Sequence, residues 1–242
     1  MPTRAGTTGG ATAPTDAGFT PASLRFEDHG AVRYDRAALS ILGELRAFAD
    51  AQPADLAGVR LRGDLRLATL LNKAGPVGGL AASLIGTGAR PVRAILFDKT
   101  PATNWALGWH QDRTIAVRER VAVAGFGPWT VKAGMLHVAP PPEVQVGMAT
   151  LRVHLDDVRT TNAPLLIAPG SHRLGRIAEC EVDAIVEASG AVACVALAGD
   201  VWAYSTPILH ASERADPPAR RRVLQIDFAA EDLPGGLQWM GI

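Results

Sequence analysis

The chain of 242 residues contains little cysteine, no excess of charge and no long apolar run. Its two cysteines, Cys180 and Cys194, lie fourteen residues apart, which fits no zinc or redox spacing and argues against a disulfide framework. Because 24 Lys and Arg residues balance 24 Asp and Glu residues, no net charge attracts nucleic acid or a membrane surface. No segment approaches the ~18 consecutive apolar residues of a membrane helix.

The N-terminus lacks the continuous apolar segment of a secretory signal. Residues 1–22 are rich in Thr, Gly, Ala and Pro, a composition typical of a flexible tail. Apolar residues make up 48% of the chain, which is enough for a sizeable core. We therefore expect a cytoplasmic protein with a flexible tail over 1–22, one domain over 23–242, and neither nucleic acid nor membrane as partner.

The first third of this domain, residues 35–90, carries helical patterns. In 35–51 the apolar side chains recur at helical spacing along one side. Residues 64–75 begin with Asp64, a plausible N-cap, and end at a glycine, and 76–88 indicate a further short helix.

From residue 91 to about 230 the chain changes to short β-branched or alternating runs, interrupted by one predicted helix over 181–190. The run 148–157 shows strict period two, with one apolar face and one mixed face. These patterns predict a mainly β fold, a two-sheet sandwich or jelly roll, with the helices of the first third packed outside. The runs are 91–98, 148–157, 163–169, 193–199, 200–206 and 221–230.

A further stretch, "GWHQDRTIAV" (108–117), carries candidate site residues: His110 and Asp112 stand two residues apart, so that on a strand both point to one face. His210, at the end of a short apolar segment, is the best third candidate. Two histidines and one carboxylate form the facial triad of non-haem Fe(II) oxygenases, which leaves three coordination positions for a co-substrate and O₂.

Such a site needs an electron donor, and a 2-oxo acid that chelates the iron leaves its far carboxylate for an arginine fork. Three arginines, 220–222, begin a few residues beyond His210, and Ser212 offers a hydroxyl. Strand alternation places Arg221 on the face opposite Arg220 and Arg222, which we expect at the surface.

At this point the chain resembles the phytanoyl-CoA dioxygenase family of Fe(II)/2-oxoglutarate oxygenases, over roughly residues 91–230. The most telling segment is the central one, because Asn-x-Pro-Leu followed by Pro-Gly-Ser-His-x-x-Gly is far rarer than His-x-Asp. The motifs are "WHQD" (109–112), "LDDVRTTNAPLLIAPGSHRLG" (155–175), "GDVWAY" (199–204), "LHAS" (209–212) and "RRVLQIDFA" (221–229).

The resemblance implies a double-stranded β-helix, the cupin-like jelly roll, and Fe(II), 2-oxoglutarate and O₂ as cofactors. It implies that the iron ligands are His110, Asp112 and His210, and that the arginine eleven residues beyond the distal histidine, Arg221, binds 2-oxoglutarate. By position, Ser212 assists Arg221, and Trp129 and Ile95 contact the co-substrate. Related halogenases lack the carboxylate, so Asp112 favours hydroxylation or another oxidation over halogenation.

The segment 125–147, with three consecutive prolines, reads as an irregular loop between strands, where lids and specificity elements occur. Within it, Lys132 and His137 are candidates to contact an anionic group of the substrate. A solvent-facing position is an equal alternative for each.

The sequence therefore predicts an Fe(II)- and 2-oxoglutarate-dependent dioxygenase that hydroxylates an unactivated C–H bond of a small molecule and releases succinate and CO₂. One alternative is another metal-dependent cupin-type enzyme that makes no use of Arg221. The other is a non-catalytic module that binds metal and 2-oxoglutarate without turnover. Succinate release distinguishes the main hypothesis from both.

Overall fold

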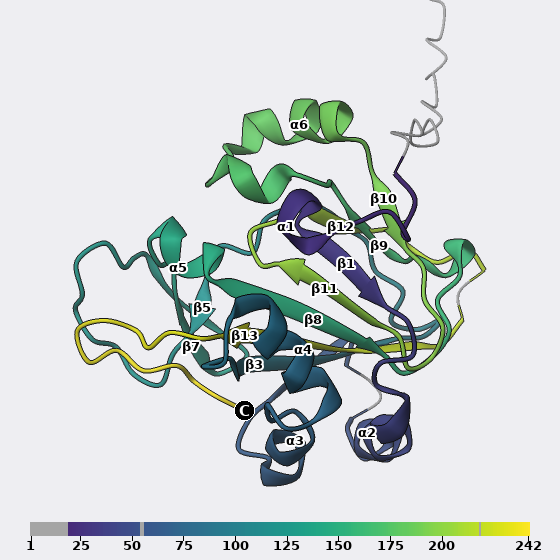
Figure 1. Cartoon of the computed structure of the whole chain (residues 1–242), viewed down its shortest axis with the longest axis horizontal. Helices are drawn as coiled ribbons and strands as arrows, with labels where there is room; N and C mark the ends of the chain where they lie inside the picture. The colour runs from purple at the N-terminus through teal and green to yellow at the C-terminus, as the bar shows by residue number, and fades with distance from the viewer. Residues whose placement is uncertain (1–18, 54–55, 218) are drawn as a thin grey trace, which may run out of the picture.

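Two β-sheets face each other in the computed structural model, which describes residues 19–53, 56–217 and 219–242, with helices on the outside (Figure 1). Most of the expected tail, residues 1–18, lies outside the described residues. The six-stranded sheet has the order β1 (Ala31–Tyr34), β11 (Val201–Ser205), β8 (Met148–His154), β13 (Arg221–Ala229), β3 (Arg90–Lys99), β2 (Gly58–Leu61). The four-stranded sheet has the order β10 (Val192–Cys194), β9 (Leu165–Ile167), β12 (His210–Ser212), β4 (Leu107–His110).

The two faces of the six-stranded sheet have different partners. Leu151 and Val153 of β8 belong to a buried cluster with Leu45 of α2 (Leu42–Asp50), so this apolar face packs against the helices. The opposite face turns toward the four-stranded sheet, where Trp202 of β11 packs with Ile167 of β9. The structure thus shows what each face of the 148–157 pattern contacts. The apolar face is covered by helices, and the mixed face points into the space between the sheets.

The predicted helices are present but shorter than the sequence suggested. Residues 35–51 become a 3₁₀ turn (η1, Leu39–Ile41) followed by α2. Helix α3 (Leu65–Leu70) begins after Asp64, whose carboxylate accepts a hydrogen bond from the Leu67 amide at 2.8 Å, which confirms the N-cap. The others are α4 (Pro76–Ile85) and α6 (Val182–Ser189), with α1 (Phe26–His29) and α5 (Pro142–Val146) as short additions, and 3₁₀ turns η2 (Thr160–Asn162), η3 (Ser171–Leu174) and η4 (Glu179–Glu181).

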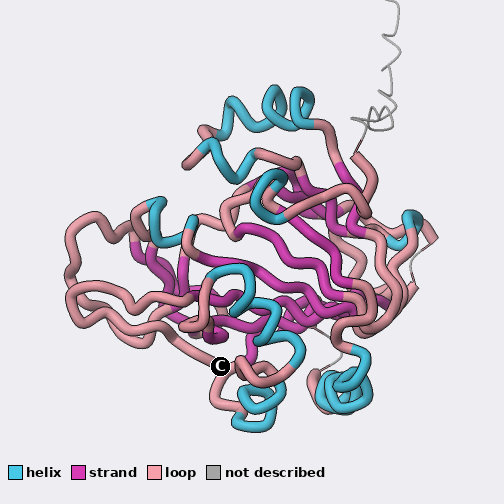
Figure 2. The backbone as a smooth tube through the Cα atoms, in the orientation of Figure 1, coloured by secondary structure: helices cyan, strands magenta, loops and turns pink. Residues whose placement is uncertain are grey.

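Two expectations about local structure were wrong. The predicted helical part 35–90 also contains β2, which pairs with β3 and forms an edge of the six-stranded sheet. The predicted irregular loop 125–147 contains a hairpin of β6 (Trp129–Lys132) and β7 (Met135–Val138), which forms a third sheet with β5 (Ile115–Ala116) (Figure 2). Its two-residue turn, Ala133 and Gly134, has positive φ at both positions, as a type I′ turn requires.

Within the ranges that the structure describes, no helix combines the length and the apolar character needed to cross a bilayer.

Leu151 tests the packing of the helix-covered face. Its side chain is fully buried in the central strand β8, so Leu151→Ala should lower the free energy of unfolding by about 2–5 kcal/mol through lost contacts and a cavity. Urea titration measures the change. The control Leu197→Ala removes a side chain that is 59% exposed and should stay within about 0.5 kcal/mol of the wild type. Equal losses for both variants would contradict this description of the core.

Candidate metal centre

The two candidate histidines meet because their strands are neighbours. In the antiparallel pair β4–β12, His110 lies directly opposite His210, and their ring centroids are 4.3 Å apart. Asp112 follows β4 by two residues. One ligand atom from each of these three side chains lies within 4.8 Å of the others. The structure thus brings together the three residues that the sequence singled out.

Hydrogen bonds fix the tautomers of both rings. Nδ1 of His110 lies 2.8 Å from the Gly108 carbonyl oxygen, and Nδ1 of His210 lies 3.0 Å from that of Ile208. Since a carbonyl oxygen only accepts, each Nδ1 carries the proton and donates it. Each Nε2 therefore keeps its lone pair for a metal, which is the arrangement that orients histidine ligands in metal sites.

Arg93 of β3 stabilises the ionised form of the Asp112 carboxylate. The Arg93 guanidinium donates to Asp112 through Nη2 at 3.0 Å and to Asp227 through Nε at 2.6 Å. Burial favours the neutral acid, but the positive charge of Arg93 outweighs it and holds the pKa of Asp112 at about 2. Asp112 is consequently an anionic ligand across the physiological pH range.

The same surroundings keep His210 neutral. Burial is the main cause that lowers the pKa of His210 to about 4, against the opposing effect of Asp112. A neutral imidazole, the free Nε2 of His110 and one carboxylate form a mixed nitrogen and oxygen donor set that suits Fe(II). The residues present therefore fit an iron ion of the facial-triad type.

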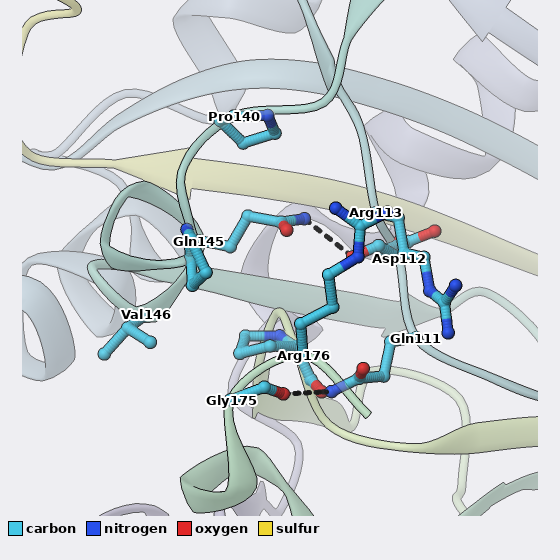
Figure 3. A pocket seen from close by; sticks show the side chains of 10 residues that line it. Gln111, Asp112, Arg113, Pro140, Gln145, Val146, Gly175 and Arg176 are labelled. Atoms are coloured by element: carbon cyan, nitrogen blue, oxygen red, sulfur yellow. Dashed lines mark hydrogen bonds between the residues drawn. The ribbon is translucent and has the colours of Figure 1, made fainter. Parts of the chain in front are cut away.

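The turn between the ligands is held from behind by two glutamines (Figure 3). Gln111, between His110 and Asp112, donates through Nε2 to the carbonyl oxygens of Gly175 at 2.9 Å and Pro207 at 2.7 Å. Gln145 donates to the Asp112 carbonyl oxygen at 2.6 Å. The Pro207 contact ties the turn to the segment that leads into β12, so Gln111 joins the two halves of the metal centre.

A cavity of about 240 Å³ opens in front of the ligands, between the two sheets. Arg221, at the start of β13, lines it and is almost completely buried. Its Nη1 donates to the Ala163 carbonyl oxygen, whereas its Nε has no hydrogen-bond partner. Burial and then the charge of Arg152 lower the pKa of Arg221 to about 9, because no carboxylate of the described residues pairs with it. The cavity thus holds a buried cation without an anion.

Ser212 lines the same end of the cavity, next to Lys99. The Lys99 ammonium donates to Ser212 Oγ at 3.1 Å and to the Glu213 carbonyl oxygen at 2.5 Å. Because Ser212 Oγ accepts this bond, its own proton is free to donate to a bound carboxylate.

The structure separates the remaining predicted contacts into two groups. Ile95 and Lys132 line the cavity. Trp129 and His137 do not: Trp129 packs among apolar side chains of the third sheet with Arg120 over its ring, and His137 is fully buried in β7. The hairpin β6–β7 turns alternate side chains to opposite sides, which moves Trp129 away from the face that presents Lys132.

Sequence analysis missed Arg93 and Lys99 and left Arg152 undecided. A usable signal existed, because Arg93, Ile95, Phe97 and Lys99 share one face of β3 by period two, and Ile95 was already a candidate. Arg222, expected at the surface, is buried on the helix side, where it binds Asp156 and Asp50. Arg220 is half exposed beside Asp98, as expected for a residue outside the cavity.

Comparisons with known proteins agree with this geometry. A family model described as phytanoyl-CoA dioxygenase (PhyH) matches residues 46–223. No curated protein sequence matches the chain.

Several solved structures share the fold. EctD from S. alaskensis, solved with 2-oxoglutarate and 5-hydroxyectoine, is 15% identical, has a TM-score of 0.59 and aligns over 90% of this chain and 77% of its own. HygX from Streptomyces hygroscopicus, solved with nickel and 2-oxoglutarate, is 15% identical with a TM-score of 0.55, over 84% of each chain. SnoK, a non-heme alpha-ketoglutarate-dependent carbocyclase, is 15% identical with a TM-score of 0.60, over 96% and 91%. At these identities the likeness establishes the fold, a double-stranded β-helix.

Gln111 offers a test of how the metal centre is supported. Gln111→Ala should weaken Fe(II) binding by about 10–100-fold, because the turn that carries His110 and Asp112 loses its bonds to Gly175 and Pro207. Anaerobic titration with Fe(II) measures the affinity, and circular dichroism checks the fold. Gln238→Ala, an exposed glutamine outside the centre, is the control. Unchanged Fe(II) affinity in Gln111→Ala would show that the turn keeps its shape without these bonds.

Proposed function

The chain belongs to the phytanoyl-CoA dioxygenase family of iron- and 2-oxoglutarate-dependent oxygenases, and from that premise we propose that it hydroxylates an unactivated C–H bond of a small organic molecule. The observation that carries the proposal is a single cavity that combines the His110–Asp112–His210 cluster with the guanidinium of Arg221, whose Nε has no hydrogen-bond partner. The family's name does not identify the substrate.

In this proposal, His110, Asp112 and His210 hold the iron, and Arg221 with Ser212 binds the distal carboxylate of 2-oxoglutarate. An arginine fork and a hydroxyl are suited to a carboxylate, and burial strengthens both bonds. The nearby Arg152 donates to Gln225 Oε1 at 2.6 Å, and its charge adds to the positive potential that attracts the dianion.

When iron is bound, the chemistry it supplies is the oxidative decarboxylation of 2-oxoglutarate by O₂, which yields succinate and CO₂ and leaves one oxygen atom for insertion into the C–H bond. The chain contributes placement and exclusion of water. Phe97, Leu107 and Leu165 form apolar lining near the ligands, against which a carbon skeleton can lie. The presence of Asp112 as a third ligand favours hydroxylation over halogenation.

The first experiment is an anaerobic titration of the protein with Fe(II) and then 2-oxoglutarate, followed by the visible iron-to-ketoacid charge-transfer band. His210→Ala should abolish the band. Arg221→Ala should weaken 2-oxoglutarate binding by about 30-fold or more, since truncation of one partner of a buried charge pair costs about 2–5 kcal/mol. Arg220→Ala, a change of the neighbouring arginine on the opposite face of the strand, should leave binding unchanged.

The other outcomes decide between the alternatives. Bound iron without a band, and equal behaviour of the Arg220 and Arg221 variants, would favour a cupin-type enzyme that needs no oxo acid. A band without any succinate release across a broad substrate panel would favour a non-catalytic 2-oxoglutarate-binding module.

Lys99 makes 2-oxoglutarate binding dependent on pH. Burial, followed by the charge of Arg221, lowers the pKa of Lys99 to about 8, and a bound carboxylate nearby raises it again. Below pH ~8 the free lysine is already a cation, so the affinity is constant. Above it, binding must take up a proton, and the affinity should fall by up to about tenfold per pH unit.

The dissociation constant of 2-oxoglutarate, measured across pH ~7 to ~9, checks this expectation. Lys99→Met should bind more weakly at pH ~7 and show a flatter profile. If the affinity of the wild type depends on pH as little as that of the variant, the protonation of Lys99 does not change when 2-oxoglutarate binds.

A further inference from the structure

One row of side chains crosses the inner face of the six-stranded sheet. Arg152 of β8 is opposite Gln225 of β13, Gln225 is opposite Ile95 of β3, and Ile95 is opposite Arg60 of β2. All four line the cavity. With strands ~4.8 Å apart, the backbones at the two ends of the row are about 14 Å apart. The row therefore presents an arginine from each side of the cavity.

The cavity carries more positive charge than the co-substrate needs. Asp112 is the one carboxylate in its lining as the structure describes it. Arg93 is already bound to Asp112 and Asp227, so its charge is compensated. The five cationic lining residues are Arg60, Arg93, Lys132, Arg152 and Arg221.

The uncompensated cations form two separate groups. Arg152 lies near Arg221 and lowers the pKa of that residue, whereas Arg60 stands at the other end of the row, three strands away from Arg152. Burial and then the charge of Arg93 lower the pKa of Arg60. Burial lowers the pKa of Lys132, the charge of Asp112 opposes this, and the charges of Arg93 and Arg60 lower it further. Arg60 and Lys132 thus share one side of the cavity, away from the Arg221 end.

Neither member of this second group forms a salt bridge within the described residues, and Asp112, whose charge acts on Lys132, is already bound by Arg93. The Arg60 Nε is buried and has no hydrogen-bond partner. The Lys132 ammonium donates to the Thr114 hydroxyl at 3.1 Å, and Thr114 is neutral. A 2-oxoglutarate molecule that reaches from the iron to Arg221 has no third carboxylate for this side. The second cationic group needs a different anion.

Resting on the proposed function, we propose that the primary substrate carries a carboxylate or phosphate group, bound by Arg60 and Lys132. Its carbon skeleton then lies along the apolar lining of the cavity, formed by Phe97, Trp105 and Leu107. Arginine binds either anion with two parallel hydrogen bonds, and lysine adds a point charge. The substrate class is an organic acid or a phosphate monoester with an apolar portion.

His137 has no part in this anion site. Its Nδ1 lies 2.9 Å from the Met135 carbonyl oxygen and must donate, so its Nε2 is an acceptor and repels an anion. Burial lowers the pKa of His137, which keeps the ring neutral. The expected pair of Lys132 and His137 is therefore replaced by Lys132 and Arg60, a residue that the sequence did not single out.

The test uses the anaerobic protein loaded with Fe(II) and 2-oxoglutarate, and three probes of similar size: benzoate, phenyl phosphate and the neutral benzamide. Thermal stabilisation and changes in the charge-transfer band measure binding of each probe. At least one anion should bind to the wild type, and benzamide should not. The anion that binds more tightly identifies the substrate class as carboxylate or phosphate.

Arg60→Gln and Lys132→Gln should each weaken binding of that anion by at least about tenfold, the value of one charge-assisted hydrogen bond. Arg62→Gln, at an exposed arginine two residues beyond Arg60, is the matched control and should change nothing. All three variants should bind 2-oxoglutarate with wild-type affinity, because none of these residues lies at the Arg221 end.

Three results would overturn the inference: no binding of either anion to the wild type, equal binding of benzamide, or unchanged anion affinity in both Arg60→Gln and Lys132→Gln. The charge-transfer band is recorded before the probes are added. A normal band with any of these results removes the anion site and leaves the proposed oxygenase intact, whereas absence of the band removes the oxygenase proposal itself.

Discussion

The site depends on one arginine that lies between two sheets. Arg93 is the direct cross-strand partner of Asp227, and its guanidinium also binds Asp112, which follows strand β4 of the opposite sheet. Thr150 completes the group by donating to the other Asp227 oxygen at 3.1 Å. A buried carboxylate without a cation would take up a proton and lose its value as a ligand. Arg93 therefore supplies the charge and the position of Asp112 before any metal arrives.

The placement of Arg93 follows from the alternation of the six-stranded sheet. Leu96 of β3 and Leu224 of β13 face the helices, and their neighbours along each strand, Ile95, Phe97 and Gln225, face the cavity. A shift of one residue in β3 or β13 would exchange the two sets. The neighbouring residues Arg221 and Arg222 illustrate this alternation. Arg221 lines the cavity, whereas Arg222 binds acidic side chains on the helix side. The apolar packing of the helices thus fixes the register on which the polar face depends.

The two faces of the six-stranded sheet explain which parts of the site the sequence alone could predict. The triad was accessible because His-x-Asp places two ligands on one short strand. Arg221 was accessible through the family resemblance, which selects the arginine eleven residues beyond His210, and strand alternation separates it from Arg220 and Arg222. Which face pointed inward was inaccessible, because that depends on where the helices pack. Arg60 was invisible for the same reason: it lies in a segment that reads as helical, and its strand is defined by pairing with β3. Trp129 was misplaced because the hairpin that carries it forms its own sheet.

The position of β2 at the edge of its sheet has a consequence for how such a protein can change over time. Arg60 lies on this edge strand and Lys132 on the separate hairpin, whereas Arg221 and Arg152 belong to interior strands with neighbours on both sides. Replacements at the edge disturb fewer pairings than replacements in the interior. Descendants of one ancestor can therefore acquire new preferences through a few peripheral substitutions, while the oxidising centre is inherited intact.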